Sequence, residues 1–157
     1  MKRYLIYFLV LLSAFAFSCS EDDDPTQTLN YELLDWTECS FAFSFQSGDS
    51  FIINDTASFN ALIDTIAYTN CVNFDYPEID FENYTLLGLF SEGGGCEASY
   101  DRSFTRNEDI QNYEYKVTVN YTGGCDMLIM HANWILVDKI PENAVVLFQL
   151  YQTSQQQ

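Results

Sequence analysis

The segment from Gln111 to Tyr121 constrains the fold more than any other part of the chain. Its apolar and aromatic residues occupy every second position, and polar residues fill the positions between them: Tyr113, Tyr115, Val117, Val119 and Tyr121 alternate with Glu114, Lys116, Thr118 and Asn120. Successive side chains of a strand point to opposite faces of a sheet, so this period predicts a strand with one face in a core and the other toward solvent. Such a strand requires neighbouring strands, which makes a sheet the basis of the fold.

Other segments with β-branched and aromatic residues predict further strands, at residues 31–36, 40–45, 51–53, 84–90, 96–104, 125–137 and 144–151. Turns are expected at Glu92–Gly95, where the glycines would supply a hairpin with positive φ, and in the charged stretch 105–110. Because short turns separate the strands after residue 84, we expect them to form an antiparallel meander. Aromatic residues make up 17% of the chain, which also favours strands.

One helix is expected after Asp55 or Thr56, either of which can cap its N-terminus, and it should end by Tyr68. Its apolar residues recur at helical spacing and form one stripe: Phe59, Leu62, Ile63 and Ile66. We therefore predict an α+β, β-rich domain, an antiparallel sheet or flattened barrel of about six to eight strands with one packed helix.

The N-terminus has the parts of a secretory signal. Lys2 and Arg3 precede an apolar run of about 14 residues, which is shorter than the roughly 20 that a spanning helix needs. The run ends in Ala16-Phe17-Ser18-Cys19, which resembles the bacterial lipobox, although Ala16 stands where that box usually has leucine. The resemblance implies cleavage before Cys19, which becomes the new N-terminus and carries acyl chains that would anchor the protein to a membrane. An ordinary secretory signal is the alternative.

The residues after Cys19 are acidic. The run Ser20-Glu21-Asp22-Asp23-Asp24 resembles the lipoprotein export signal of Bacteroidota, which directs a lipoprotein to the outer face of the outer membrane. A periplasm-facing lipoprotein and a merely solvated linker are the alternatives. We expect a signal peptide at 1–18, a lipidated acidic leader at 19–28, one β-rich domain at 29–153 and a disordered tail at 154–157.

Four of the five cysteines remain after Cys19 is assigned to the anchor. An even number in an exported chain favours two disulfides. We favour Cys96–Cys125, because each cysteine follows a glycine-rich turn and opens a strand, and Cys39–Cys71 follows by elimination. A zinc site is disfavoured because the chain has no CxxC pair and its one histidine, His131, is not adjacent to a cysteine in sequence.

No catalytic or cofactor motif is present. The chain lacks GxxxxGK[ST], GxGxxG and GxSxG, and His131 lies within a predicted strand. The acidic residues between Asp75 and Glu82 do not have the spacing of a calcium-binding loop, although calcium remains an alternative for them. The net charge of −17 excludes nucleic acid as a partner. We expect a protein that is not an enzyme and needs neither cofactor nor metal.

Aromatic side chains are the best candidates for a binding surface. Exposed tryptophan and tyrosine can form platforms for sugars or proteins. We select Trp36, Trp134, Tyr113 and Tyr115 as a candidate ligand platform, with packing in the core as the alternative for each one.

From Phe51 onward the order of features resembles known proteins. A strand and a helix lead to Pro77-Glu78-Ile79-Asp80-Phe81 and Tyr84-Thr85-Leu86-Leu87-Gly88, and Trp134 to Pro141 precede a final strand. This order resembles small uncharacterised Bacteroidota surface lipoproteins and, more remotely, the C-terminal domain of the PrcB protease-complex subunit. We expect an outer-membrane lipoprotein, exposed at the cell surface, that binds an extracellular protein or glycan. The PrcB resemblance implies the alternative, an accessory or inhibitory subunit of an extracytoplasmic protease.

Overall fold

The computed structural model describes residues 26–34, 36, 39, 44–67, 74–107 and 112–155, and the fold is given for these residues. The elements, in chain order, are β1 (Thr26–Thr28), β2 (Glu32–Leu34), β3 (Ser50–Ile53), α2 (Thr56–Ala67), β4 (Tyr84–Gly94), β5 (Glu97–Asn107), β6 (Asn112–Thr122), β7 (Leu128–Asp138) and β8 (Val146–Gln155). Within these ranges no helix is long and apolar enough to cross a membrane.

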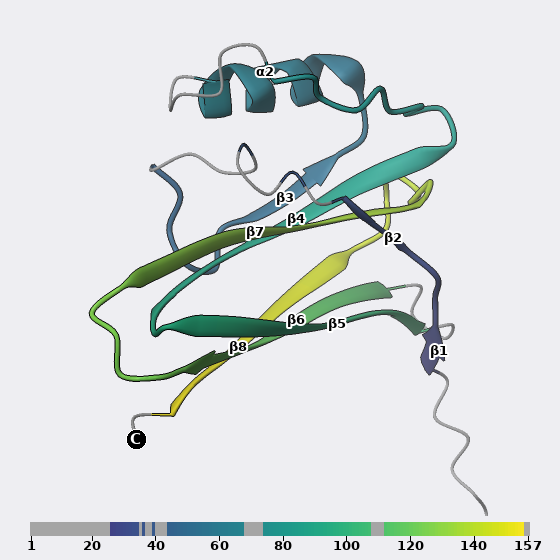
Figure 1. Ribbon diagram of the computed structural model, residues 1–157. Helices are drawn as coiled ribbons and strands as arrows, with labels where there is room; N and C mark the ends of the chain where they lie inside the picture. The colour runs from purple at the N-terminus through teal and green to yellow at the C-terminus, as the bar shows by residue number, and fades with distance from the viewer. Residues whose placement is uncertain are drawn as a thin grey trace, which may run out of the picture.

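The described strands form two sheets of four strands each, and the helix adds a third layer (Figure 1). The middle sheet has the order β2-β7-β4-β3, and the outer sheet has the order β1-β5-β6-β8. Helix α2 covers the face of the middle sheet that points away from the outer sheet (Figure 1). The prediction of a β-rich α+β fold with one packed helix is confirmed at this level, but the strands form two open sheets, neither a single sheet nor a barrel.

The two inner strands of the middle sheet, β4 and β7, are buried on both faces. In β4 every residue from Thr85 to Ser91 is buried, and alternate side chains enter different clusters. Leu87 and Leu89 pack against the outer sheet, whereas Leu86 and Phe90 pack against the layer of α2. A strand covered on both faces becomes a continuous apolar run, which explains why residues 84–90 show no alternation in sequence.

The outer sheet is buried on one face only. The predicted alternation in β6 is confirmed, because its tyrosines and valines at odd positions are all buried in the cluster between the sheets. Strand β5 pairs with β6 along its whole length, from Glu97↔Thr122 to Asn107↔Asn112. The stretch Thr105–Asn107 therefore belongs to a strand, where a turn was expected.

The antiparallel meander is wrong. Among the described strands from β4 onward, only β5 and β6 are consecutive neighbours in one sheet, while β4 pairs with β7, and β8 pairs with β6 in parallel. The physical reason is that one sheet cannot bury both faces of β4, so the chain crosses between layers after β4, β6 and β7. The expected turn at Glu92–Gly95 is also wrong for Glu92, Gly93 and Gly94, which remain in β4 opposite β7. The positive φ angles among the described glycines occur at Gly48 and Gly123.

Helix α2 begins as predicted. Asp55 accepts a hydrogen bond from the Ser58 N–H at 2.8 Å, so it caps the helix. The predicted apolar stripe faces the middle sheet, with Phe59, Leu62 and Ile66 buried. The N-cap and the helical spacing are both local signals, and both are confirmed.

Several strand boundaries differ from the prediction. Strand β2 is shorter than 31–36, and the structure places Ser44 and Phe45 outside any strand, while residues 40–43 lie outside the described ranges. Strand β7 begins at Leu128, three residues after Cys125. Strand β8 extends to Gln155, beyond the domain boundary expected at 153.

Candidate functional site

The predicted aromatic platform does not exist as a surface. Trp36 and Trp134 are 4% and 1% exposed, and their rings stack at 5.4 Å between α2 and the middle sheet. Tyr113 and Tyr115 are 8% and 0% exposed and belong to the other cluster, between the two sheets. Because β7 is covered on both faces and β6 on one, the large rings on these strands fill the core. These four residues therefore provide no ligand platform.

A polar network crosses the cluster between the sheets. Arg102 of β5 donates from Nε and Nη2 to Asn133 Oδ1 of β7, at 3.1 and 2.7 Å. Asn133 is fully buried, and its Nδ2 donates to the Leu89 carbonyl and to Ser91 Oγ. The Tyr115 hydroxyl donates to the Asn133 carbonyl at 3.1 Å. The network gives its buried polar groups partners, and it links the two sheets across an apolar cluster.

His131 belongs to the same network. Its Nε2 lies 3.2 Å from Arg102 Nη2, and its ring lies against the Tyr100 ring with centroids 4.5 Å apart. A guanidinium has donors only, so Nε2 must accept and the ring carries its proton on Nδ1. Nε2 thus faces the guanidinium of Arg102, a donor, and the ring lies on the phenol of Tyr100. This arrangement orients Arg102.

Burial keeps the tyrosines of this cluster neutral. Burial raises the pKa of Tyr100 to about 12, with a smaller contribution from Tyr121. Burial also raises the pKa of Tyr115 well above its ordinary value, against the opposing effect of Arg102. Both phenols therefore act as neutral hydrogen-bonding groups throughout the ordinary pH range.

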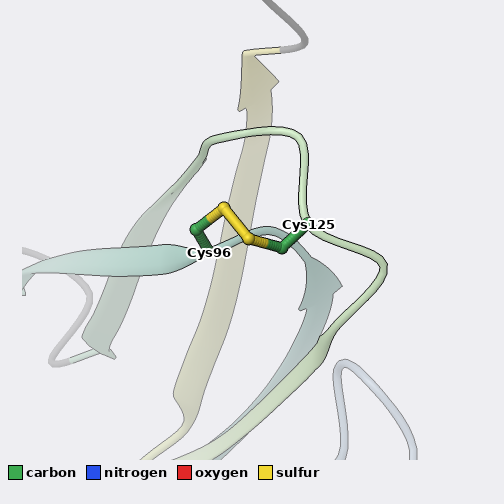
Figure 2. Close-up of a disulfide and its surroundings, with 2 residues drawn as sticks. All are labelled: Cys96 and Cys125. Atoms are coloured by element: carbon green, nitrogen blue, oxygen red, sulfur yellow. A yellow bond between two sulfur atoms is a disulfide. The ribbon is translucent and has the colours of Figure 1, made fainter.

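A disulfide joins two of the crossings between layers. Figure 2 shows Cys96, between β4 and β5, bonded to Cys125, between β6 and β7, with Cα atoms 4.9 Å apart. Gly123 lies beside it with φ of +84°, and a Cβ there would come 2.5 Å from Cys96 Sγ. The predicted pairing is present, although neither cysteine lies in a strand. Cys39 is also disulfide-bonded; its predicted partner Cys71 lies outside the described residues, as do Cys19 and the run Ser20, Glu21, Asp22, Asp23 and Asp24.

The acidic stretch forms a hollow of about 710 Å³ at the start of α2, lined in part by Asp55, Glu78, Asp80 and Glu82. Asp55 caps the helix, and Asp80 accepts hydrogen bonds from Asn83 Nδ2 at 2.8 Å and the Glu82 N–H at 3.0 Å. These bonds lower the pKa of Asp80, the Asn83 side chain contributing most. Two of the four carboxylates thus support local turns. Throughout the described ranges no three His, Cys, Asp or Glu side chains are grouped to hold a metal ion.

The turn after β7 holds this region together. Lys139 Nζ donates to the carbonyls of Asn54 and Phe81, at 2.8 and 2.7 Å. The Ile140 N–H donates to Thr85 Oγ1, which itself donates to Asn54 Oδ1. The turn Lys139-Ile140-Pro141 therefore links the end of β7 to the segments before α2 and β4. Sequence order alone does not reveal these bonds.

The strongest candidate for a binding surface is β8, which sequence analysis did not select. Among the described strands it lies at an edge of the outer sheet and pairs with β6 alone, and none of its ten residues is charged or a proline. Leu147 and Tyr151 lie on its solvent face and are 47% and 53% exposed. Gln149 lies between them, donating to Glu114 Oε2 at 3.0 Å and accepting from the Tyr151 hydroxyl at 2.8 Å. We call Leu147, Gln149 and Tyr151 the β8 surface.

The β8 surface is unusual for an edge strand. Natural sheets protect such edges with short strands, lysine, proline or bulges, because an unpaired row of backbone groups can pair with another chain. Strand β8 is long and carries none of these residues. Lys116 of β6, the nearest cation in register, lies beside Gln149 one strand further in. The arrangement can therefore accept an extended segment, with backbone bonds at the edge and apolar contacts on the solvent face.

No family model, curated protein or solved structure matches the chain. The function is therefore inferred from the chain's own residues.

Proposed function

We propose that the protein is a non-enzymatic binding module that is anchored to the outer membrane through lipid on Cys19 and displayed at the cell surface. Its ligand is an extended segment of a protein partner, which binds along β8. The open, uncharged edge of β8 carries this proposal. The signal sequence and the acidic run after Cys19 support the location.

Protein is favoured over glycan as the ligand. The rings that would have formed a sugar platform are buried. The β8 surface instead combines a backbone edge with two apolar side chains on one face, four positions apart with Gln149 between them, which suits strand addition. Each cross-strand side-chain pair contributes roughly 0.2–1 kcal/mol, so a segment pairing with half of β8 gains a few kcal/mol at most from these side-chain contacts, in addition to its backbone hydrogen bonds. A protease subunit is the partner that the PrcB resemblance implies.

Site-specific photo-crosslinking in intact cells tests the binding role. A photoreactive residue at Leu147 or at Tyr151 should capture the same protein, whereas one at the exposed Asp64 of α2 should not. A Leu147→Lys variant crosslinked from position 151 should lose the adduct, because a lysine on an edge strand opposes pairing. An Asp64→Lys variant is the matched control. Equal capture from positions 64 and 151, or an adduct indifferent to Leu147→Lys, would refute the role of β8.

The anchor is tested separately. Cys19→Ser should abolish incorporation of labelled palmitate and release the protein from the membrane fraction. Protease added to intact cells should degrade the wild-type protein if it faces outward. Full protection of the lipidated protein would place it on the periplasmic side.

A further inference from the structure

A second hollow opens between β1, β5, β6 and the end of β7. Its volume is about 370 Å³, and the residues that matter are Thr28, Asn30, Arg106, Tyr113, Asp138 and Lys139. It lies on the inner side of the outer sheet, where Arg106 pairs in register with Gln27 of β1 and with Tyr113 of β6. The β8 surface is on the opposite side of that sheet, so the hollow is independent of the proposed function.

Arg106 is the unusual residue in this hollow. Its Nε is buried and has no hydrogen-bond partner. Its guanidinium carbon lies 5.6 Å from the centre of the Tyr113 ring, and that ring stacks on Phe104 at 5.7 Å. The Tyr113 ring, itself stacked on Phe104, therefore lies against the guanidinium, while the buried Nε–H remains without an acceptor. Buried donors in folded proteins nearly always have a partner, so this one calls for an explanation.

Two of the three other described cations have hydrogen-bond acceptors. Arg102 donates to Asn133, and Lys139 donates to two backbone carbonyls. The chain has 23 carboxylates and six lysines and arginines, so an arginine can readily find an acid to pair with. In the described part of the chain Arg106 nevertheless pairs with no carboxylate. A planar guanidinium fixed on a ring is suited to a carboxylate, which it binds through two parallel hydrogen bonds.

The rest of the lining restricts the ligand. Asp138 is also part of the hollow and would repel a bare anion. Asn30 supplies an amide, which can accept as well as donate. A ligand with hydrogen-bond donors close to its carboxylate satisfies both kinds of group. The volume lies near the lower end of the range for small-molecule sites, about 300–1,000 Å³.

We propose that this hollow binds a small ligand that bears a carboxylate flanked by hydroxyl or ammonium donors, with the carboxylate on Arg106. An acidic sugar and an amino acid or peptide end share this chemistry. The two sources are distinguished by the probes below.

The test is isothermal titration calorimetry on the full-length lipidated protein in detergent micelles. Glucuronate is compared with glucose, and dialanine with its C-terminal amide. At least one acid should bind ten times more tightly than its neutral counterpart, and the acid that does so identifies the source. Arg106→Gln should weaken that binding at least tenfold. Lys116→Gln, which removes one positive charge from the solvent face of the same sheet, should change it less than threefold.

A measurement on the wild-type protein keeps the test independent of whether the Arg106→Gln variant folds. In a nitrogen–proton spectrum of the wild-type protein, the Arg106 Nε–H signal, assigned with Arg106→Lys, should shift on titration with the binding acid while that of Arg102 stays in place. The proposal is overturned if neither acid binds better than its neutral counterpart. It is equally overturned if Arg106→Gln binds as the wild type does, or if the Arg106 signal does not move.

Discussion

Gly88 is the position at which a single methyl group should disturb the core most. It lies in the middle of β4, opposite Trp134 of β7, and its Cα is covered by the indole ring. A Cβ built at Gly88 would come 2.1, 2.4 and 2.6 Å from three atoms of that ring. To restore ordinary contact at 3.4 Å, the ring would have to move by about 1.3 Å.

The surroundings leave the ring no room for this movement. Trp134 is 1% exposed, and the rings of Trp36 and Phe51 both lie with centroids 5.4 Å from its own. Gly88→Ala should therefore lower the free energy of unfolding by about 3 kcal/mol, the upper part of the range for overpacked cores. The φ angle of Gly88 lies outside the left-handed region, so backbone strain does not contribute.

Guanidinium denaturation of the chain from Ser20 onward, followed by far-ultraviolet circular dichroism, measures the effect. Gly94→Ala is the matched control in the same strand, because the nearest heavy atom to its Cβ would be 3.9 Å away, and its stability should change by less than about 0.5 kcal/mol. In a Trp134→Leu background, Gly88→Ala should cost at least about 1.5 kcal/mol less than in the wild type. Equal losses for Gly88→Ala and Gly94→Ala, or additive losses with Trp134→Leu, would refute the reasoning.

Three further predictions rest on other parts of the fold. Replacing Cys96 and Cys125 together with alanine should lower the free energy of unfolding by about 3–4 kcal/mol in urea, because the bond closes a loop with a sequence separation of 29, and an unchanged midpoint would contradict this. Asp55→Ala should lower the melting temperature at neutral pH, and the difference should vanish in acid. The Ser58 N–H and hydroxyl lower the pKa of Asp55 below its ordinary 3.8. The contribution of the Asp55 carboxylate to stability is therefore present above pH 3.8 and is lost as the pH falls below it. Burial raises the pKa of Tyr100 to about 12, so its contribution to the free energy of unfolding is present below pH 10 and is lost as the pH rises toward about 12. Tyr100→Phe should reduce this loss of stability in alkali, and tyrosinate absorbance follows the titration.

Sequence patterns correctly predicted the elements that depend only on residues close together in the chain. The alternation in β6 and the cap and stripe of α2 are confirmed, because each depends on residues within one turn or one strand. The Cys96–Cys125 pair is also present, although the strands do not begin at the cysteines. The candidate site was predicted poorly. Aromatic residues chosen for a platform are in the core, and β8 and Arg106 gave no signal, since an open edge and a missing acceptor are properties of the assembled layers.

The sequence by itself determined that this chain builds a β-rich domain with one capped, amphipathic helix, because period, caps and turn residues act over a few positions. It also carries, in Lys2 to Asp24, the features that predict export and lipidation. Only the tertiary structure decided that β4 and β7 are covered on both faces, that β8 joins β6 in parallel, and that Trp36 and Trp134 stack out of reach of any ligand. These outcomes depend on which faces meet across layers, and burial of apolar area between distant segments selects them.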